Sequence, residues 1–358
     1  MKHGIRQLLF VAKWYLWIPL ARIAGQLRST RQIIFSWSAS GSATGAATGT
    51  GADIQLGPRV ALFMHFDGRG IVRPQVLNYI RELKANGLDV VLVSNAGKLA
   101  PEALAVLQEV CAGIILRKNI GYDFGAWRDA VDYLDLPRAQ TQEVILANDS
   151  VFGPLAPLGD ALRRLDYSKA DIWGLTESWQ VRYHLQSFFL AFGPVALRAK
   201  AWREFWDDVR PVPMKSYVVH RYEVGITQAM IKGGLSCAAL WPYEALVKMV
   251  SRETLKELVG EEEQADPNKA DPIQTTRRLQ VLRIRDCVAR RKALNPTSDL
   301  WRQLLLSGFP FIKRELLRDN PTRVEDVGDW AAVVRDTLGA DPEPILQDLR
   351  LMLKGGAP

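Results

Sequence analysis

Short apolar segments alternate with longer segments of helical periodicity from about residue 59 onward. Uninterrupted runs of β-branched and other apolar residues predict buried strands at 60–66, 89–94, 113–116 and 143–147. The segments at 73–86 and 101–110 carry apolar residues at the spacing of amphipathic helices. Strands that alternate with helices in this way are joined by crossover connections, which make neighbouring strands parallel. The pattern therefore predicts an α/β fold with a mostly parallel sheet.

The later part of the chain continues this rhythm and then changes. Two further strands are predicted at 171–176 and 184–190. Residues 250–290 are charged, and we expect them to be irregular. Because the remainder is expected to be helical, we divide this part of the chain into a core domain, 58–250, and a charged loop with a C-terminal helical region, 251–358.

The first 52 residues contain no acidic residue, and basic and aromatic residues are interleaved up to about residue 35. This pattern is typical of an amphipathic helix at a membrane interface, and an ordinary helix packed on the core is the alternative. Lys13 and Pro19 interrupt the apolar run, so we do not expect a membrane span. Residues 36–57 begin with a run of Ser, Gly, Ala and Thr, which predicts a flexible linker between the helix of residues 1–35 and the core.

Composition narrows the class of protein. With 358 residues, of which 48% are hydrophobic, the chain is long enough to bury a substantial core. Its formal net charge of +7 favours an anionic partner. Nucleic acid is not expected, because the positive charge is concentrated in the aromatic N-terminal segment and no nucleic-acid-reading motif is recognised. Three widely spaced cysteines indicate neither a disulfide framework nor a zinc site, and a reducing cytoplasm fits best.

Polar residues gather after the third predicted strand, at a place where parallel sheets bind ligands. Asn119, Gly121 and Asp123 lie there, directly before a predicted helix. A glycine permits close approach of the backbone to a ligand, and a helix N-terminus attracts anions. Asp123 also fits a simple helix cap, and the two roles are compatible.

A second polar group, Asn148, Asp149 and Ser150, follows the fourth predicted strand. Asp149 is the candidate ligand for a divalent cation, Mg²⁺ or Mn²⁺, which would neutralise a leaving diphosphate. Asp and Asn commonly occupy turns after strands, so the pattern alone is not specific.

Three further residues are candidates for contact with an acceptor. Glu223 lies at the start of a predicted helix, and it is our candidate for the general base that takes a proton from an attacking hydroxyl. A carboxylate that is simply favourable at a helix N-terminus is the alternative. His184 and Gln186 lie in the predicted strand at 184–190 and are candidate acceptor contacts, although a lone histidine is more often structural.

Six motifs follow one another between about residues 59 and 320. They are NIGYDFGAW at 119–127, ILANDSVFGP at 145–154, DIWG at 171–174, HLQSFFL at 184–190, YEVG at 222–225, and a segment from Asn295-Pro296 to PFIK at 310–313. In this order the motifs resemble the rhamnan synthesis F family, which is similar to a divergent branch of the GT-A glycosyltransferases.

This resemblance implies a GT-A-like, Rossmann-type domain that binds a nucleotide sugar and acts as an inverting rhamnosyltransferase. The donor would be dTDP-L-rhamnose, and the acceptor a lipid-linked glycan of lipopolysaccharide or a related rhamnose polymer. The enzyme would be cytoplasmic and attached peripherally to the inner face of the cell membrane. In the family's plan the groups around Asn119 and Asn148 bind the donor, and Glu223 is the acidic base.

One departure from that plan concerns the metal. Asp149 is the single acid where a metal-binding Asp-x-Asp pair is expected, and this leaves metal dependence open. Arg117 and Lys118 are then candidates to help stabilise the leaving diphosphate. The alternative function is a non-catalytic subunit that binds glycans or nucleotide sugars within a polysaccharide synthesis complex.

Overall fold

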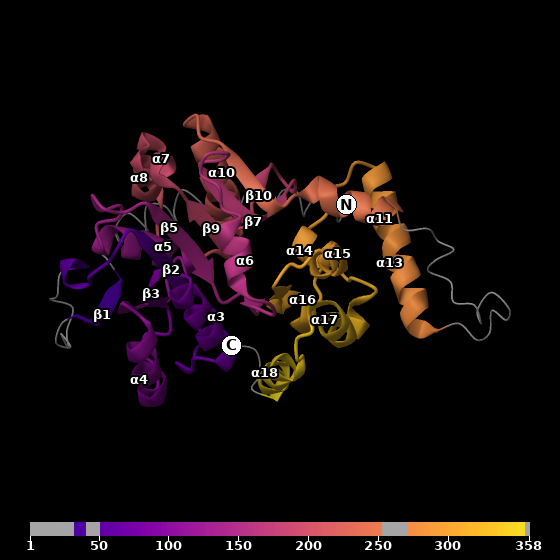
Figure 1. Cartoon of the computed structure of the whole chain (residues 1–358), viewed down its shortest axis with the longest axis horizontal. Helices are drawn as coiled ribbons and strands as arrows, with labels where there is room; N and C mark the ends of the chain where they lie inside the picture. The colour runs from indigo at the N-terminus through magenta and orange to yellow at the C-terminus, as the bar shows by residue number, and fades with distance from the viewer. Residues whose placement is uncertain (1–31, 41–50, 253–270, 355–358) are drawn as a thin grey trace, which may run out of the picture.

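A computed structural model describes residues 32–40, 51–252 and 271–354. These residues form a central sheet with helices on both faces, and a group of C-terminal helices lies at one end of the sheet (Figure 1). Among them, no helix combines the length and the apolar character that crossing a membrane requires. Positions 1–31 of the expected amphipathic helix lie outside the described residues.

Within the described residues, nine strands form one sheet. They are β1 (Ile33–Ser38), β2 (Arg59–His65), β3 (Asp89–Ser94), β4 (Gly113–Arg117), β5 (Glu143–Asn148), β7 (Ile172–Ser178), β8 (His184–Leu185), β9 (Phe189–Phe192) and β10 (Cys237–Trp241). The order is β1-β4-β3-β2-β5-β9-β7-β10, with β8 paired to β7. β4, β3, β2 and β5 are parallel, as is the pair β7 and β10, whereas β9 runs antiparallel between β5 and β7. The expected α/β fold with a large, mostly parallel sheet is confirmed.

Helices pack on both faces of the sheet. One face is covered by α3 (Pro74–Ala85), α4 (Pro101–Val110) and α6 (Leu158–Arg163). The other is covered by α5 (Tyr122–Tyr133), α7 (Pro194–Arg198), α8 (Lys200–Asp208), α9 (Lys215–Val218) and α10 (Val224–Lys232). Alternate residues of β2 point to opposite faces, so that Leu62 packs in one core cluster and Phe63 in the other. This two-sided burial explains why the strands appear in the sequence as uninterrupted apolar runs.

The C-terminal helices are attached to the sheet domain: the first two pack into one of its core clusters, and those from Trp301 onward share a cluster of their own. In chain order the helices are α11 (Tyr243–Arg252), α13 (Pro272–Ala289), α14 (Pro296–Asp299), α15 (Trp301–Leu306), α16 (Arg314–Arg318), α17 (Trp330–Leu338) and α18 (Glu343–Lys354). Trp301, Val334 and Ile345 are buried together in that cluster. A short strand pair, β6 (Val151–Phe152) with β11 (Ile312–Lys313), connects it to the segment directly after β5.

The expected division of the chain near residue 35 is not what the structure shows. Residues 33–35, expected to end a helix, and 36–38, expected to begin a linker, form β1 and pair antiparallel with β4. Phe35 and Trp37 pack against the core, and the Ser36 hydroxyl hydrogen-bonds with the Tyr133 hydroxyl at 2.8 Å. Because alternate side chains of IIFSWS find partners on the sheet, the strand prevails over the linker-like composition that follows it. Most of that Ser, Gly, Ala and Thr run, at positions 41–50, lies outside the described residues.

Two other expectations differ from the structure. The single strand expected at 184–190 is divided into β8 and β9, since the Gln186 side chain between them is engaged by Thr176 and Thr297. The region expected to be irregular at 250–290 contains the 18-residue helix α13. The Asp271 carboxylate caps that helix by accepting a hydrogen bond from the Ile273 N–H at 3.0 Å.

Candidate functional site

A cavity of about 640 Å³ lies at the edge of the sheet where β2 and β5 end. Four of the residues singled out in the sequence line it: Asn119, Asp123, Asp149 and Ser150. Residues from β11, α16 and α18 complete its wall. The carboxyl ends of parallel strands leave backbone groups and loops free to meet a ligand, so this cavity is the candidate functional site.

Asn148, the last residue of β5, links the two polar groups that the sequence indicated. Its Nδ2 donates a hydrogen bond to Asp123 Oδ2 at 2.7 Å. Its Oδ1 accepts hydrogen bonds from the backbone N–H of Ser150 at 3.1 Å and from the Ser150 hydroxyl at 2.5 Å. The side chain is buried beneath the cavity and fixes the positions of Asp123 and Ser150 in its wall.

Asp123 is an acid in an unfavourable environment for a negative charge. Burial raises its pKa to about 6, and the charges of Asp149 and Glu223 add to that effect. Lys313 and the hydrogen bond from Asn148 act in the opposite direction. The side chain does not cap α5, because Gly121 occupies the N-cap position. A perturbed acid in a cavity is a common feature of functional sites.

Gly121 does not line the cavity, and its role is to permit the backbone conformation at the start of α5. Its φ of 86° lies in the left-handed region, which L side chains rarely adopt. A Cβ at this position would lie 2.7 Å from Pro211 Cα. The glycine therefore allows the chain to turn from β4 into α5 and to bring Asp123 to the cavity.

Asp149 does not have the surroundings of a metal ligand. Its Oδ2 accepts a hydrogen bond from the Phe66 N–H at 3.3 Å and lies 3.4 Å from Arg314 Nη1. In the part of the chain that the structure describes, no three His, Cys, Asp or Glu side chains gather as a metal ion would require. Since a lysine and an arginine also line this part of the cavity, the residues present do not fit a resident Mg²⁺ or Mn²⁺.

Lys313 and Arg314 are functional candidates that the sequence analysis did not select. Lys313 Nζ donates a hydrogen bond to the Ser150 hydroxyl at 2.9 Å, and Arg314 Nη1 donates one to the backbone oxygen of Asp149 at 2.7 Å. Both residues belong to the PFIK segment or follow it directly, and this was the available signal. Their partners lie more than 160 positions earlier in the chain, so only the fold brings them together.

Arg117, expected to help stabilise a diphosphate, is engaged elsewhere. Its side chain is fully buried and forms an ion pair with Asp129 at 2.9 Å. It also donates hydrogen bonds to Asn95 Oδ1 and to the backbone oxygen of Ile120. With its donors directed at these internal partners, Arg117 has a structural role.

The three expected acceptor-side residues separate into two groups. Glu223 ends a π-helical turn, Val219–Glu223, and its Oε1 accepts a hydrogen bond from the Ser187 N–H at 3.3 Å. Glu223 is not among the residues that line the cavity, although its charge raises the pKa of Asp123 and of Lys313 in the cavity wall. His184 and Gln186 are buried. The His184 ring bonds to a backbone oxygen, and the Gln186 amide group is held by internal partners.

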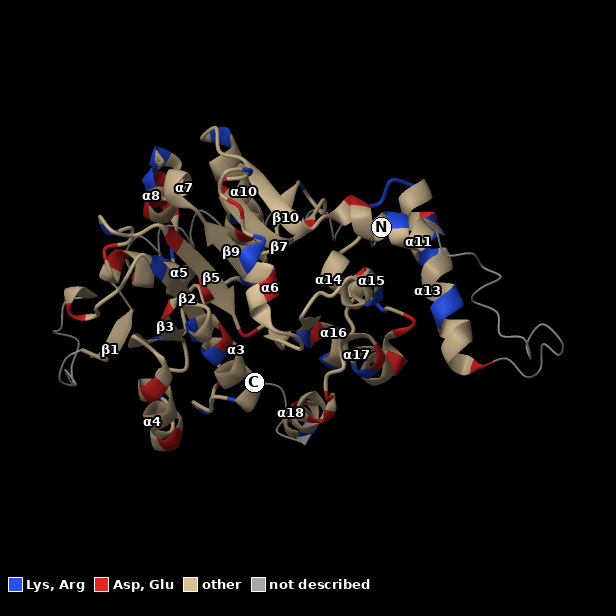
Figure 2. Ribbon diagram, in the orientation of Figure 1, with Lys and Arg blue, Asp and Glu red and all other residues tan. Residues whose placement is uncertain are grey.

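The charges on the described surface are mixed. Figure 2 shows basic and acidic residues interspersed on α8 and around α16 and α17. On α8, Lys200 forms an ion pair with Glu204. The basic residues that line the cavity are thus distinguished by their position at the ends of the strands and not by a broad positive face.

Comparisons with known proteins give a match to one family and similarity to individual relatives. The family described as rhamnan synthesis protein F matches residues 90–252. The virulence protein VirA of Vibrio anguillarum is 30% identical over 244 residues, which cover 67% of this chain and 73% of VirA. An uncharacterized protein, y4gN, of Sinorhizobium fredii is 30% identical over 193 residues, which cover 53% of this chain and 50% of y4gN. The family match spans β3 to α11 and includes the residues around Asp123, Asp149 and Glu223.

Proposed function

Because the chain belongs to the rhamnan synthesis F family, we propose that it is a glycosyltransferase that moves L-rhamnose from dTDP-L-rhamnose onto a lipid-linked glycan. The family description concerns polysaccharide synthesis and supports a transferase-like role at that level. The observation that carries the proposal is the cavity at the ends of β2 and β5, where acids and cations from distant segments meet.

The fold supports a GT-A-like assignment for residues 58–250. Four consecutive strands of this segment, β2 to β5, are parallel, and helices connect β2 to β3, β3 to β4 and β4 to β5. Such a unit binds nucleotides beyond the carboxyl ends of its strands. Asn119 and Ser150 line the cavity at that edge, and with Asp123 they are the proposed contacts for the nucleotide sugar. Gly121 and Asn148 hold these contacts in position.

We assign the role of general base to Glu223. Its carboxylate is half-buried, is oriented by the Ser187 N–H, and acts electrostatically on Asp123 in the cavity wall. In an inverting transfer, the acceptor oxygen forms a bond to the anomeric carbon while the bond from that carbon to the diphosphate breaks. The proton of the acceptor hydroxyl passes to Glu223, and the electron pair of the broken bond remains on the departing dTDP.

The acceptor and the cellular location are also part of the proposal. The basic and aromatic residues of the first 35 positions support attachment to an anionic membrane surface, where a lipid-linked acceptor resides. The enzyme would then act at the cytoplasmic face. His184 and Gln186 are buried in the segment that leads from β7 to β9. In this proposal they support the wall of the acceptor site from the protein interior.

Release of dTDP from dTDP-L-rhamnose by the purified protein, with a membrane lipid extract as acceptor, tests this function. A Glu223→Gln variant should lower kcat by about 10²- to 10⁴-fold with little change in KM for the donor, because it removes the base but keeps the shape. The matched control is Glu244→Gln, whose side chain is 80% exposed on α11. Donor binding without turnover by the unaltered protein would instead favour the non-catalytic subunit.

A further inference from the structure

The Lys313 ammonium contacts Ser150, the neighbour in sequence of Asp149, which is the expected ligand of a divalent cation. Its Nζ donates a hydrogen bond to the Ser150 hydroxyl at 2.9 Å and lies 5.0 Å from the centre of the Phe188 ring. Among its electrostatic partners are the carboxylates of Asp123 and Glu223. The ammonium at the end of β5 therefore has a hydroxyl partner and nearby negative charge, with the positive charge of Lys215 also acting on it.

The backbone holds this ammonium in place. Lys313 is the second residue of β11 and pairs with Val151 of β6, the residue that directly follows Ser150. The backbone N–H of Arg314 donates a hydrogen bond to the Ser150 oxygen at 3.0 Å. Because the β6–β11 pair and this hydrogen bond fix the distance between the two segments, the cation is positioned before any ligand binds.

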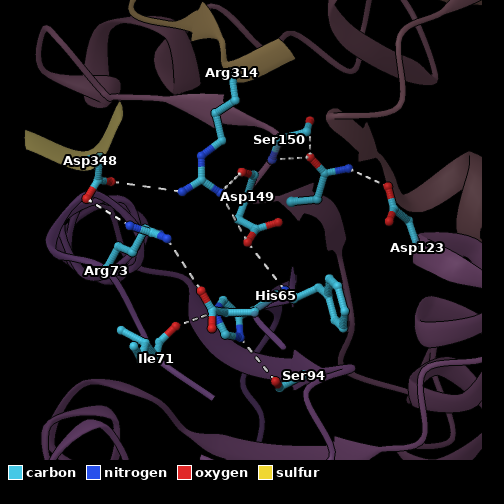
Figure 3. A network of polar contacts seen from close by, with 12 residues as sticks. His65, Ile71, Arg73, Ser94, Asp123, Asp149, Ser150, Arg314 and Asp348 are labelled. Atoms are coloured by element: carbon cyan, nitrogen blue, oxygen red, sulfur yellow. Dashed lines mark hydrogen bonds and ion pairs between the residues drawn. The ribbon is translucent and has the colours of Figure 1, made fainter. Parts of the chain in front are cut away.

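Arg314 provides a second cation beside the first. Figure 3 shows its guanidinium between Asp149 and Asp348, with Arg73 on the other side of Asp348. Two of its nitrogen atoms, Nε and Nη2, are buried without a hydrogen-bond partner among the described residues. Asp149 thus orients an arginine that retains donors for an anionic ligand.

The Arg73 and Arg314 pair already accommodates carboxylate oxygens. Asp348 Oδ1 lies 3.4 Å from Arg73 Nη1, and its Oδ2 lies 4.0 Å from Arg314 Nη2. These distances are long for charge-assisted hydrogen bonds, which are usually 2.7–2.9 Å. A diphosphate in the cavity would offer oxygens to the arginines without displacing a tight internal ion pair.

From this placement we infer that Lys313 and Arg314 are the cations that bind the donor's diphosphate and stabilise it as it leaves, and that the protein needs no divalent ion to do so. The inference rests on the proposed transferase function and assigns the charge-neutralising step to this chain's own residues. As the bond from the anomeric carbon to the β-phosphate oxygen breaks, that oxygen gains negative charge, and the N–H groups of Lys313 and Arg314 donate to the diphosphate.

Binding of dTDP to the full-length protein, measured by calorimetry in EDTA and again in Mg²⁺, tests the inference. We expect the two dissociation constants of the unaltered protein to agree within about threefold, because the neutralising charges are built in. Lys313→Met should weaken dTDP binding in EDTA by about 10- to 150-fold, the range expected when a hydrogen bond to a charged group is lost. Lys313→Arg should retain most of the affinity because it keeps the charge.

Two comparisons make the result specific. The control Lys200→Met removes a lysine whose side chain is 85% exposed on α8 and should leave dTDP binding unchanged. Thymidine, which lacks phosphates, should bind equally to the unaltered protein and to Lys313→Met. Loss of dTDP binding by the unaltered protein in EDTA, with recovery in Mg²⁺, would overturn the inference and leave the transferase proposal intact. Failure to bind dTDP, UDP or GDP in either condition would contradict both.

Discussion

Replacing Asp123 by asparagine is expected to stabilise the folded protein, and the gain should increase with pH. The folded state raises the pKa of this carboxyl from 3.8 to about 6, chiefly by burial and then through the nearby charges of Asp149 and Glu223. The folded protein therefore binds the proton more tightly than the unfolded chain does. The contribution of this protonated carboxyl to the free energy of unfolding is fully present below pH 3.8. It is lost as the pH rises through about 6, where the folded protein must carry the charge.

The size of the effect follows from that difference in pKa. A rise from 3.8 to about 6 corresponds to at most about 3 kcal/mol of lost stability above pH 7, and to about 1.6 kcal/mol at pH 5. Asparagine removes the charge and keeps an oxygen that can accept the hydrogen bond from Asn148 Nδ2. The increase in the free energy of unfolding of Asp123→Asn over the unaltered protein should therefore be about 1.4 kcal/mol larger at pH 7.5 than at pH 5.

Urea unfolding at pH 5 and pH 7.5 measures this directly, since the midpoint reports the free energy of unfolding when the slope is unchanged. Asp336→Asn is the matched control, because that carboxylate is exposed on α17 and its replacement should change stability equally at both pH values. An Asp123→Asn variant that is less stable than the unaltered protein, or equally affected at both pH values, would refute the reasoning. Increased stability at the expense of activity is the usual behaviour of a residue retained for function.

Two further substitutions test the supports of the site. Gly121→Ala should lower the free energy of unfolding by at least about 1–2 kcal/mol, because it places a side chain in the left-handed region and a Cβ 2.7 Å from Pro211 Cα; thermal unfolding measures the loss. Asp326→Ala should cost about 1.5–3 kcal/mol in urea unfolding, because the buried Arg302 guanidinium loses the partner that lies 2.7 Å from its Nε and retains Asp329 at 2.5 Å from its Nη2. Asp319→Ala, at an exposed ion pair, should cost less than about 1 kcal/mol and serves as the control.

The order of the strands and helices could be predicted wherever burial alone decides the sequence pattern. Strands β2, β3 and β5 and helices α3 and α4 agree with the predicted segments to within one or two residues, because each is a continuous apolar run or a clear amphipathic period. Short pairings such as β6 with β11 could not be predicted in this way. Two residues carry no period, and their partner lies about 160 positions away.

Other differences arose where local composition and tertiary contacts disagree. The 250–290 region is rich in charge, yet α13 forms there because Asp271 and Pro272 begin the helix and Val281 and Ile284 give it a buried side. The strand β1 forms because β4 offers an open edge. For β1 the deciding partner, β4, lies about 80 positions later, so the window of residues around the segment does not contain the information. For α13 the start signal is local, and the charge of the surrounding residues obscured it.

Only the part of the site that the sheet domain provides could be predicted from the sequence. Asn119, Asp123, Asp149 and Ser150 could be selected because they follow predicted strands, and all four line the cavity. The general rule that ligands bind at strand ends identifies the edge of the sheet, but it does not identify what faces that edge. Lys313 and Arg314 face it from the C-terminal region, and the PFIK motif that contains or precedes them does not show which part of the sheet they contact.

This arrangement changes how the boundary at residue 250 is understood. The sheet domain contributes acids, an amide, a serine and the cations Arg69, Arg73 and Lys215 to the cavity, and the region after residue 250 adds Lys313, Arg314 and Arg318. A site for a diphosphate needs positive charge, and Asp123 and Asp149 supply the opposite sign. The C-terminal helices therefore belong to the site and are not an extension packed beside it. The β6–β11 pair joins the two regions at Ser150 and brings the Lys313 ammonium to the end of β5, where Asn148 and Ser150 lie.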